Sequence, residues 1–405
     1  MPQQTYSMLA RIPSPLGFDH LKGRRVSIYA EKWLAPVLTS YASSRADVAN
    51  PRSQTMNVWI NDPIFIVGDH FVLRIPIVAH NIYKMKITIP IRGGEFEYLS
   101  EEYQNFLNDI VSFNDKPKLI KLIGIDSGSY RIENVNFSLL NRQVFDEEAN
   151  YHILKIRSNH PDLRFSWDNE FLVLDIEFGE ENYRDKLIPT IIDGIIDKVS
   201  LLVNLSYSTN VDFLEGVIYK GEEYIGKTEP IISDLHYAYE HAHNMNWPEI
   251  NSIEIDKVIN WFEENELNLE GNSKNKLQRA INAFSHVLVG LGEKDTSQFF
   301  WQMLGIEALL ASGINSISSQ IELKSSLILG EPKEYKKKIK QLYNYRSRLL
   351  HGDFDFPPKF SSDEDNFEKE YWDYLSFSTS ILLALIRNLI AKGGIEYKFE
   401  YNLIE

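Results

Sequence analysis

The sequence predicts an α+β N-terminal domain with a mainly antiparallel sheet, followed by an all-α helical bundle. Three observations carry this prediction. The first half of the 405-residue chain contains short runs rich in β-branched and aromatic residues, separated by Gly, Asn, Asp and Pro. After about Pro230, apolar residues recur at three- and four-residue spacing instead. Glycines separate these later segments, as in a bundle of helices joined by short turns.

The N-terminal half is expected to be a sheet with two inserted helices. Phe171–Phe178 ends with apolar and acidic residues alternating, which is typical of a half-buried strand. Glu101–Phe113 and Ile188–Leu205 favour helices instead. The strand-like runs are MNVWIN, IFIVGDHFVLRIPIV, KITIPIR, YHILKIR and FLVLDIEF. Short strands combined with a few helices favour an α+β domain with a largely antiparallel sheet.

The C-terminal half is expected to form a bundle of five or six helices. Its periodic segments are Ile253–Leu267, Lys276–Leu291, Ser297–Ala311, Ile317–Leu329, Lys333–Leu350 and Phe367–Ala391. The domain boundary is expected within Tyr219–Ile231, a polar stretch that contains two Gly and a Pro. The predicted domains are therefore residues 1–228, a sensor or regulatory domain of no assigned family, and residues 229–405.

Composition excludes several classes of chemistry. The chain has no Cys, which excludes disulfides, thiolate metal sites and thiol nucleophiles and fits a reducing cytoplasm. Its formal net charge of −15 opposes non-specific binding to nucleic acid or to an anionic membrane. The apolar stretch Ile381–Ala391 is too short to span a bilayer and contains Arg387. We expect a cytoplasmic protein with no membrane partner, cofactor or metal.

Two local patterns have ordinary explanations. Gly221–Thr228 fits the spelling of a phosphate-binding P-loop, but Glu229-Pro230 follows it where that loop needs a helix, so a hairpin or linker is expected. His236, Glu240 and His243 have the spacing of one helical face and are possible metal ligands. No further ligand is visible, and a polar face of the first bundle helix is the alternative.

The strongest functional signal is the tract Lys333–Asp353. Between Lys333 and Arg348 it contains seven Lys or Arg and one Glu, on a chain that is acidic overall. Such a tract suits a phosphate-binding surface, although a basic helix can also simply pair with acidic neighbours.

The end of this predicted helix has a more specific pattern. Gly352 is a natural residue to end a helix, so His351 is expected at the last helical position. Histidine exchanges a proton near neutral pH, and the Arg346 guanidinium can bind a phosphate through several N–H donors. Together they could cleave RNA without metal: the 2′-OH is deprotonated and attacks the adjacent phosphorus, and the 5′ oxygen leaves.

This tract resembles the HEPN superfamily, and specifically the Apea-like HEPN domain, over about residues 232–395. The matching residues are Tyr345-Arg346-Ser347-Arg348, followed by His351-Gly352. Upstream, the aromatic residues 299–301 leading to Glu307 resemble the family's earlier helix, and Phe367–Ala391 resembles its long closing helix. Ser347 is a departure, because the common form has Asn after the Arg.

The resemblance implies a metal-independent endoribonuclease, often an anti-phage, abortive-infection or toxin protein, whose bundle dimerises so that two motifs share one cleft. Arg346 and His351 would be catalytic, and Ser347 and Glu307 would be supporting residues. Lys337 and Lys340 would contact RNA phosphates, and Arg348 would either contact a phosphate or pair with Glu307. The expected partners are an RNA substrate (tRNA or mRNA) and further copies of the chain. The N-terminal domain could sense a phage-derived trigger, bind RNA, or hold the nuclease inactive. The alternative is a non-catalytic module for dimerisation or partner binding.

Overall fold

The computed structural model describes five strands within residues 7–74 and, from residue 83 to residue 399, all but residues 95, 125–130, 141–146, 162, 164–169, 180–186, 234, 268, 290–296, 314–315, 332–335 and 354–365. The chain forms two compact units, Met1–Asn81 and Ile82–Glu405. The first unit contains β1 (Ser7–Ala10), β2 (Arg25–Tyr29), β3 (Thr55–Trp59), β4 (Phe65–Val67) and β5 (His70–Arg74). Strands β1, β5 and β4 form one antiparallel sheet, and β2 pairs antiparallel with β3.

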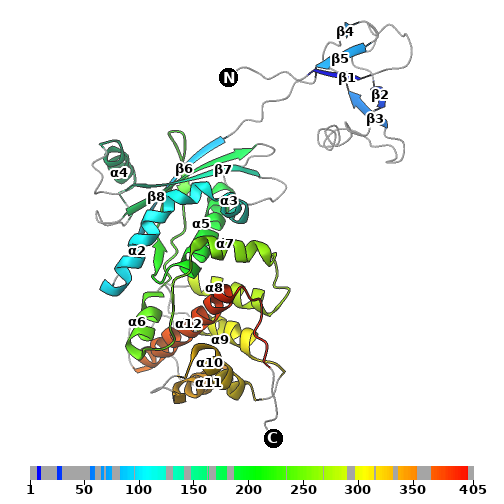
Figure 1. Cartoon of the computed structure of the whole chain (residues 1–405). Helices are drawn as coiled ribbons and strands as arrows, with labels where there is room; N and C mark the ends of the chain where they lie inside the picture. Colours follow the sequence, from blue (N-terminus) through cyan, green and yellow to red (C-terminus); the bar gives the residue numbers. More distant parts are fainter. Residues whose placement is uncertain are drawn as a thin grey trace. The chain divides into compact units, whose positions relative to one another are not determined.

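The second unit begins with a six-stranded sheet (Figure 1). Its strands are β6 (Tyr83–Gly93), β7 (Arg131–Leu140), β8 (Glu170–Gly179), β9 (Val211–Phe213), β10 (Val217–Lys220) and β11 (Glu223–Lys227). The order is β11-β10-β6-β8-β7, and β9 also pairs with β6. Ile87 of β6 lies opposite Leu174 on one side and Ile218 on the other. Every strand pairing in the described part is antiparallel, as the sequence predicts.

Helices cover both faces of this sheet. Alternate residues of β6, such as Ile87 and Ile89, join a core built with α2 (Glu97–Asp109), the 3-10 helix η2 (Ile110–Asp115), α3 (Pro117–Ile123) and α5 (Ile188–Ser206). On β10, Ile218 points into that core, whereas Val217 and Tyr219 contact Ile156 on the other face. Ile156 belongs to α4 (Glu147–Asn159). The two helices that the sequence predicts in this half correspond to α2 with η2 and to α5.

The strand predicted for YHILKIR, residues 151–157, is wrong, because these residues form part of α4. Ile153 and Ile156 are buried while Leu154 and Lys155 are exposed. Burial three residues apart is the period of a helix, and a short apolar run does not distinguish it from a strand. The P-loop spelling, in contrast, forms the β10–β11 hairpin around Gly221, as expected.

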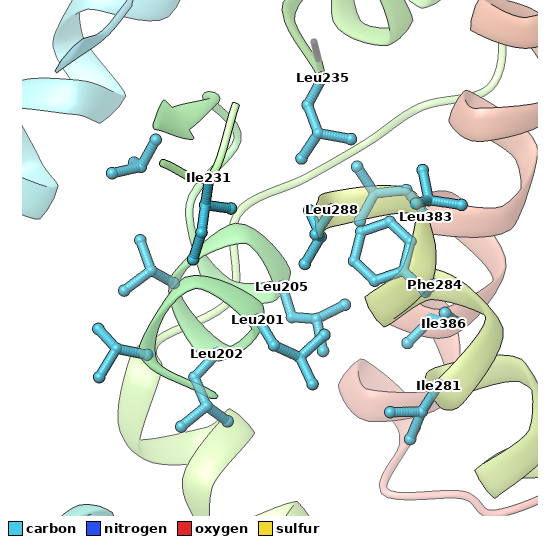
Figure 2. Close-up of a cluster of buried hydrophobic side chains, with 14 of the residues drawn as sticks. Leu201, Leu202, Leu205, Ile231, Leu235, Ile281, Phe284, Leu288, Leu383 and Ile386 are labelled. Atoms are coloured by element: carbon cyan, nitrogen blue, oxygen red, sulfur yellow. The ribbon is translucent and has the colours of Figure 1, made fainter. Parts of the chain in front are cut away.

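The C-terminal part is a run of helices, as the sequence predicts (Figure 1). The described residues contain seven helices, more than the five or six expected: α6 (Leu235–Met245), α7 (Ile255–Glu264), α8 (Lys276–Val289), α9 (Ser297–Leu310), α10 (Ile317–Leu329), α11 (Lys336–His351) and α12 (Asn366–Lys392). Helix α5 joins them to the sheet. Figure 2 shows Leu201 and Leu205 of α5 facing Phe284 of α8 and Leu383 of α12.

The expected domain boundary near residue 228 lies where the sheet and the C-terminal helices share one hydrophobic core. The stretch Tyr219–Ile231 contains most of the β10–β11 hairpin, and buried apolar residues on its two sides belong to one cluster. The physical reason is that α5 packs against α7, α8 and α12 as well as against the sheet. The separation between the two compact units falls after Asn81 instead.

Helix α12 is the central helix of the C-terminal part. Its segment Glu370–Lys392 is long and apolar enough to cross a membrane by length and composition. Of the most apolar window in that segment, 78% is buried inside the protein. The core helix of a soluble bundle has the same length and composition, so this finding is only weak evidence for a membrane-spanning helix.

Asp197 provides a test of how α5 is buried. Burial, and then the nearby Asp193, raise the pKa of Asp197 to about 6. A carboxyl with a raised folded-state pKa contributes stability below its unfolded pKa and loses it as the pH rises through the folded value. The free energy of unfolding of Asp197→Asn should therefore equal that of the wild type at pH 4. At pH 8 it should exceed the wild-type value by about 1 kcal/mol, after allowing for solvent screening.

The measurement is urea unfolding of both proteins at the two pH values. Glu249→Gln, at an exposed position, is the control and should show no such change. Equal stabilities of wild type and Asp197→Asn at pH 8 would show that this carboxyl is not destabilised by burial.

Candidate active site

Helix α11 is held against the bundle by one apolar face. Ile339, Leu342, Tyr345 and Leu349 are buried and recur at three- and four-residue spacing. The Tyr345 ring packs edge-on against Phe299 of α9, with the ring centroids 5.3 Å apart. This spacing fixes which side of α11 faces solvent.

The helix ends as the sequence predicts. His351 is its last residue, and Gly352 adopts a left-handed backbone with φ of 75°. The backbone N–H of Asp353 donates to the carbonyl of Arg348 at 2.9 Å, the bond of a Schellman motif. A residue with a Cβ is strained in this conformation, so glycine fixes the end of the helix one residue after His351.

The solvent-facing side of α11 is basic and ends in the histidine. Lys337, Lys340, Arg348 and His351 are all exposed. Residues 337, 340, 344, 348 and 351 follow one another at three- and four-residue steps, so they share one face of the helix. The structure therefore brings four of the predicted site residues onto one surface, which we call the α11 basic face.

Arg346 lies on a different side of the helix. Its Nε is 3.3 Å from Oε1 of Glu307 on α9, and its Nη2 donates to Oε2 at 3.5 Å. The guanidinium also lies 5.7 Å from the centre of the Tyr343 ring. The Arg346 side chain remains 27% exposed, so the guanidinium can still be reached from solvent. Ser347, next to it, is half-buried.

Glu307 is positioned by the close approach of α9 to α12. A Cβ on Gly305 would lie 2.8 Å from Cδ1 of Leu382, so this crossing needs glycine. Burial raises the pKa of Glu307, and the Arg346 charge opposes that rise. Of the two arginines of the motif near Glu307, Arg346 is therefore the one that the structure shows paired with this carboxylate.

Within one chain, Arg346 and His351 do not face each other. They are five residues apart, which is about 7.5 Å along the helix axis, and they point in different directions around it. One chain therefore presents the α11 basic face and the Arg346–Glu307 pair as two neighbouring features. Only a second copy of the chain could bring an Arg346 opposite a His351.

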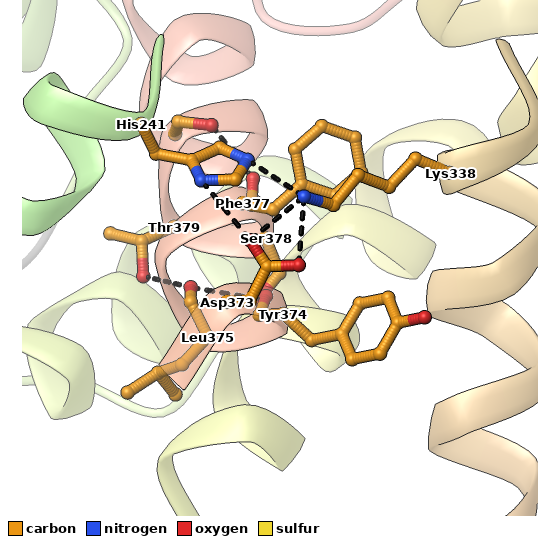
Figure 3. A network of polar contacts seen from close by, with 9 residues as sticks. His241, Lys338, Asp373, Tyr374, Leu375, Phe377, Ser378 and Thr379 are labelled. Atoms are coloured by element: carbon orange, nitrogen blue, oxygen red, sulfur yellow. Dashed lines mark hydrogen bonds and ion pairs between the residues drawn. The ribbon is translucent and has the colours of Figure 1, made fainter. Parts of the chain in front are cut away.

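The sequence interpretation missed one cluster that includes α11 (Figure 3). Lys338 Nζ contacts both carboxylate oxygens of Asp373 on α12, each at 2.8 Å. His241 of α6 lies beside this pair, with Nδ1 3.5 Å from Asp373 and Nε2 3.4 Å from Lys338. Burial, and then the Lys338 charge, lower the pKa of His241 to about 4. The sequence shows Lys338 only as one member of a run of lysines, and that run does not identify the partner of Lys338.

The side chains at His236, Glu240 and His243 do not gather around one point. His236 is buried, with its ring 3.9 Å from that of Tyr237, whereas the exposed His243 stacks on Tyr98 with ring centroids 4.3 Å apart. Among the described residues, no group of three or more His, Asp or Glu side chains is arranged to hold a metal.

Comparisons with known proteins add no assignment to this geometry. No protein-family model, no curated protein and no solved structure matches the chain.

Proposed function

We propose that the protein is a metal-independent endoribonuclease that uses the C-terminal end of α11. The observation that carries the proposal is the α11 basic face: three exposed cations and an exposed histidine on one side of a helix, in a chain of net charge −15. Nucleic-acid binding by an acidic protein needs such a local basic surface. The resemblance of Tyr345–Gly352 to the HEPN motif supports the same function.

The proposed chemistry uses one base and one set of phosphate donors. The His351 imidazole removes the proton of a ribose 2′-OH, and the 2′ oxygen attacks the adjacent phosphorus. The bond from phosphorus to the 5′ oxygen breaks, and the leaving oxygen takes a proton from the protonated His351 of a second copy. Arg348 of the basic face and Arg346 of the second copy bind the phosphoryl oxygens as negative charge develops.

Several parts of this proposal come from the resemblance. These are the homodimer or higher homo-oligomer, the tRNA or mRNA substrate, a cytoplasmic anti-phage role by abortive infection, and a phage-derived trigger sensed by the N-terminal half. Of the two compact units, only Met1–Asn81 lies outside the unit that contains α11, so a separate regulatory part would comprise these residues.

The first experiment examines the reaction itself. Incubation of the full chain with total RNA in excess EDTA should give cleavage at the rate seen without EDTA. The products should carry 2′,3′-cyclic phosphate and 5′-OH ends, because the nucleophile is the neighbouring 2′ oxygen. An RNA substituted with 2′-deoxyribose at the cleaved position is the matched control and should stay intact. Loss of cleavage in EDTA, or 5′-phosphate ends, would contradict the proposed chemistry.

A second candidate function is a non-catalytic module for partner binding. The observation that favours it is the Arg346–Glu307 pair, since this carboxylate already occupies the guanidinium. Two exposed leucines on α10, Leu323 and Leu327, are one helical turn apart and could contact a partner. This function predicts a stable complex with no RNA turnover at any protein concentration.

A further inference from the structure

A cavity of about 610 Å³ lies between α6 and α12, outside the proposed catalytic end of α11. The residues that matter in its lining are Tyr237, Glu240, His241, Asn244, Trp372 and Asp373. A volume of several hundred Å³ is that of a small-molecule site. The charges and the aromatic rings of the lining determine what the cavity can bind.

In one part of the lining, the charged and polar groups already pair with one another (Figure 3). Asp373 is neutralised by Lys338, whose Nζ also lies 5.3 Å from the centre of the Phe377 ring. His241 lies beside these charges, and its lowered pKa keeps it neutral at pH 7. This part of the lining therefore presents no net charge to a ligand. It also shows that an ammonium group and an aromatic face fit together at this place.

The lining also contains Glu240, a carboxylate with no cationic partner among the described residues. Glu240 is half-buried, and within the described residues no hydrogen bond or ion pair to its side chain is found. The negative charge of Glu240 acts on the nearby Tyr98: burial, and then this charge, raise the pKa of the Tyr98 hydroxyl. With Asp373 neutralised and His241 uncharged, the lining has one net negative charge. A half-buried carboxylate is stabilised by a partner that donates hydrogen bonds and carries positive charge.

Two aromatic rings border the same cavity. The centroids of Tyr237 and Trp372 are 5.9 Å apart, and the ring planes are inclined by 51°. Rings that are tilted and already in contact cannot hold a flat base between them. Their faces can still attract a compact cation, and Asn244 at the rim adds an amide that can accept a hydrogen bond.

We infer that this cavity binds a small organic cation, with a primary ammonium or guanidinium group paired to Glu240 and lying against the rings of Tyr237 and Trp372. The ligand is a cation because the cavity offers aromatic faces and a carboxylate that has no partner in the part of the chain that the structure describes. It is organic because the lining lacks the clustered oxygen ligands that a metal ion requires. This inference does not depend on the ribonuclease proposal, since the cavity shares no residue with the α11 basic face.

The test is isothermal titration calorimetry of the full chain with agmatine, which carries a guanidinium at one end and an ammonium at the other. Putrescine and 1,4-butanediol are the comparison probes, the first with two ammonium groups and the second neutral. We expect agmatine to bind and butanediol not to bind. Glu240→Gln should weaken agmatine binding about tenfold or more, because a charge-assisted hydrogen bond is lost without a change of shape.

Two variants complete the experiment. Tyr237→Leu removes one aromatic face at a position that is 44% exposed, so the fold should tolerate it, and it should also weaken binding. Glu249→Gln, an exposed glutamate outside the cavity lining, is the matched control and should bind like the wild type. The inference is overturned if neither agmatine nor putrescine binds the wild type at millimolar concentration. It is also overturned if Glu240→Gln binds them as tightly as the wild type, or if butanediol binds equally well.

Discussion

Replacing His351 with alanine is expected to lower the rate of RNA cleavage by about a hundred- to ten-thousand-fold, the range that general acid–base catalysis contributes. His351 is exposed at the last position of α11, where its side chain supports no buried contact. Gly352 and the bond from Asp353 to the Arg348 carbonyl, which end the helix, do not need the imidazole. The fold should therefore survive while the proton transfer is lost.

The measurement is a gel assay of purified wild type and His351→Ala on total RNA, with thermal unfolding to verify the fold. His243→Ala is the matched control, because His243 is also exposed and also lies in the last turn of a helix. It should cleave at the wild-type rate. A His351→Ala protein with full activity would eliminate the proposed mechanism. No turnover by the wild type, together with a stable protein partner, would favour the non-catalytic alternative.

Replacing Arg387 with methionine is expected to lower the free energy of unfolding by about 3–5 kcal/mol, the cost of breaking a buried charged network. Arg387 of α12 is only 3% exposed. Its guanidinium donates to backbone carbonyls and hydroxyl groups from α5, the turn that follows α5, α6 and the segment before α7. The partners are the carbonyls of Asn204, Tyr207 and Asn251, and the hydroxyls of Ser208 and Tyr239.

The expected cost has two sources. Methionine fills much of the volume but donates no hydrogen bond, so several buried acceptors lose their partner, and each such loss costs about 1–3 kcal/mol. The carbonyls of Asn204 and Tyr207 also form the negative end of α5, where a cation is stabilising. No carboxylate pairs directly with Arg387 among the described residues; Glu102 is connected to it through Ser252 and Ser208.

Urea unfolding of the two proteins measures this difference. Arg279→Met on α8 is the matched control, since Arg279 is exposed, and it should change the stability by less than about 0.5 kcal/mol. A wild-type-like midpoint for Arg387→Met would show that the network contributes little net stability. In that case the apolar packing of α12 alone would hold the helix in place.

The helices of the second half were predictable because each carries its own apolar period. Ile317–Leu329 is the range of α10 in the sequence prediction and in the structure. The end of α11 was predictable for a local reason as well, since Gly352 and the residues before it specify the Schellman motif. The strand prediction for YHILKIR was wrong, because a run of seven residues is too short for its apolar spacing to distinguish a helix from a strand.

The sequence alone determined the fold class, the position of the basic helix and the residue at which it ends, because spacing and glycine chemistry act between near neighbours in the chain. Only the tertiary structure decided which cations of that helix pair with carboxylates from other helices. Glu307 comes from α9 and Asp373 from α12, and these carboxylates neutralise Arg346 and Lys338 while Lys337, Lys340 and Arg348 stay exposed. Coulomb attraction depends on distance in space, and separation along the chain does not reveal that distance.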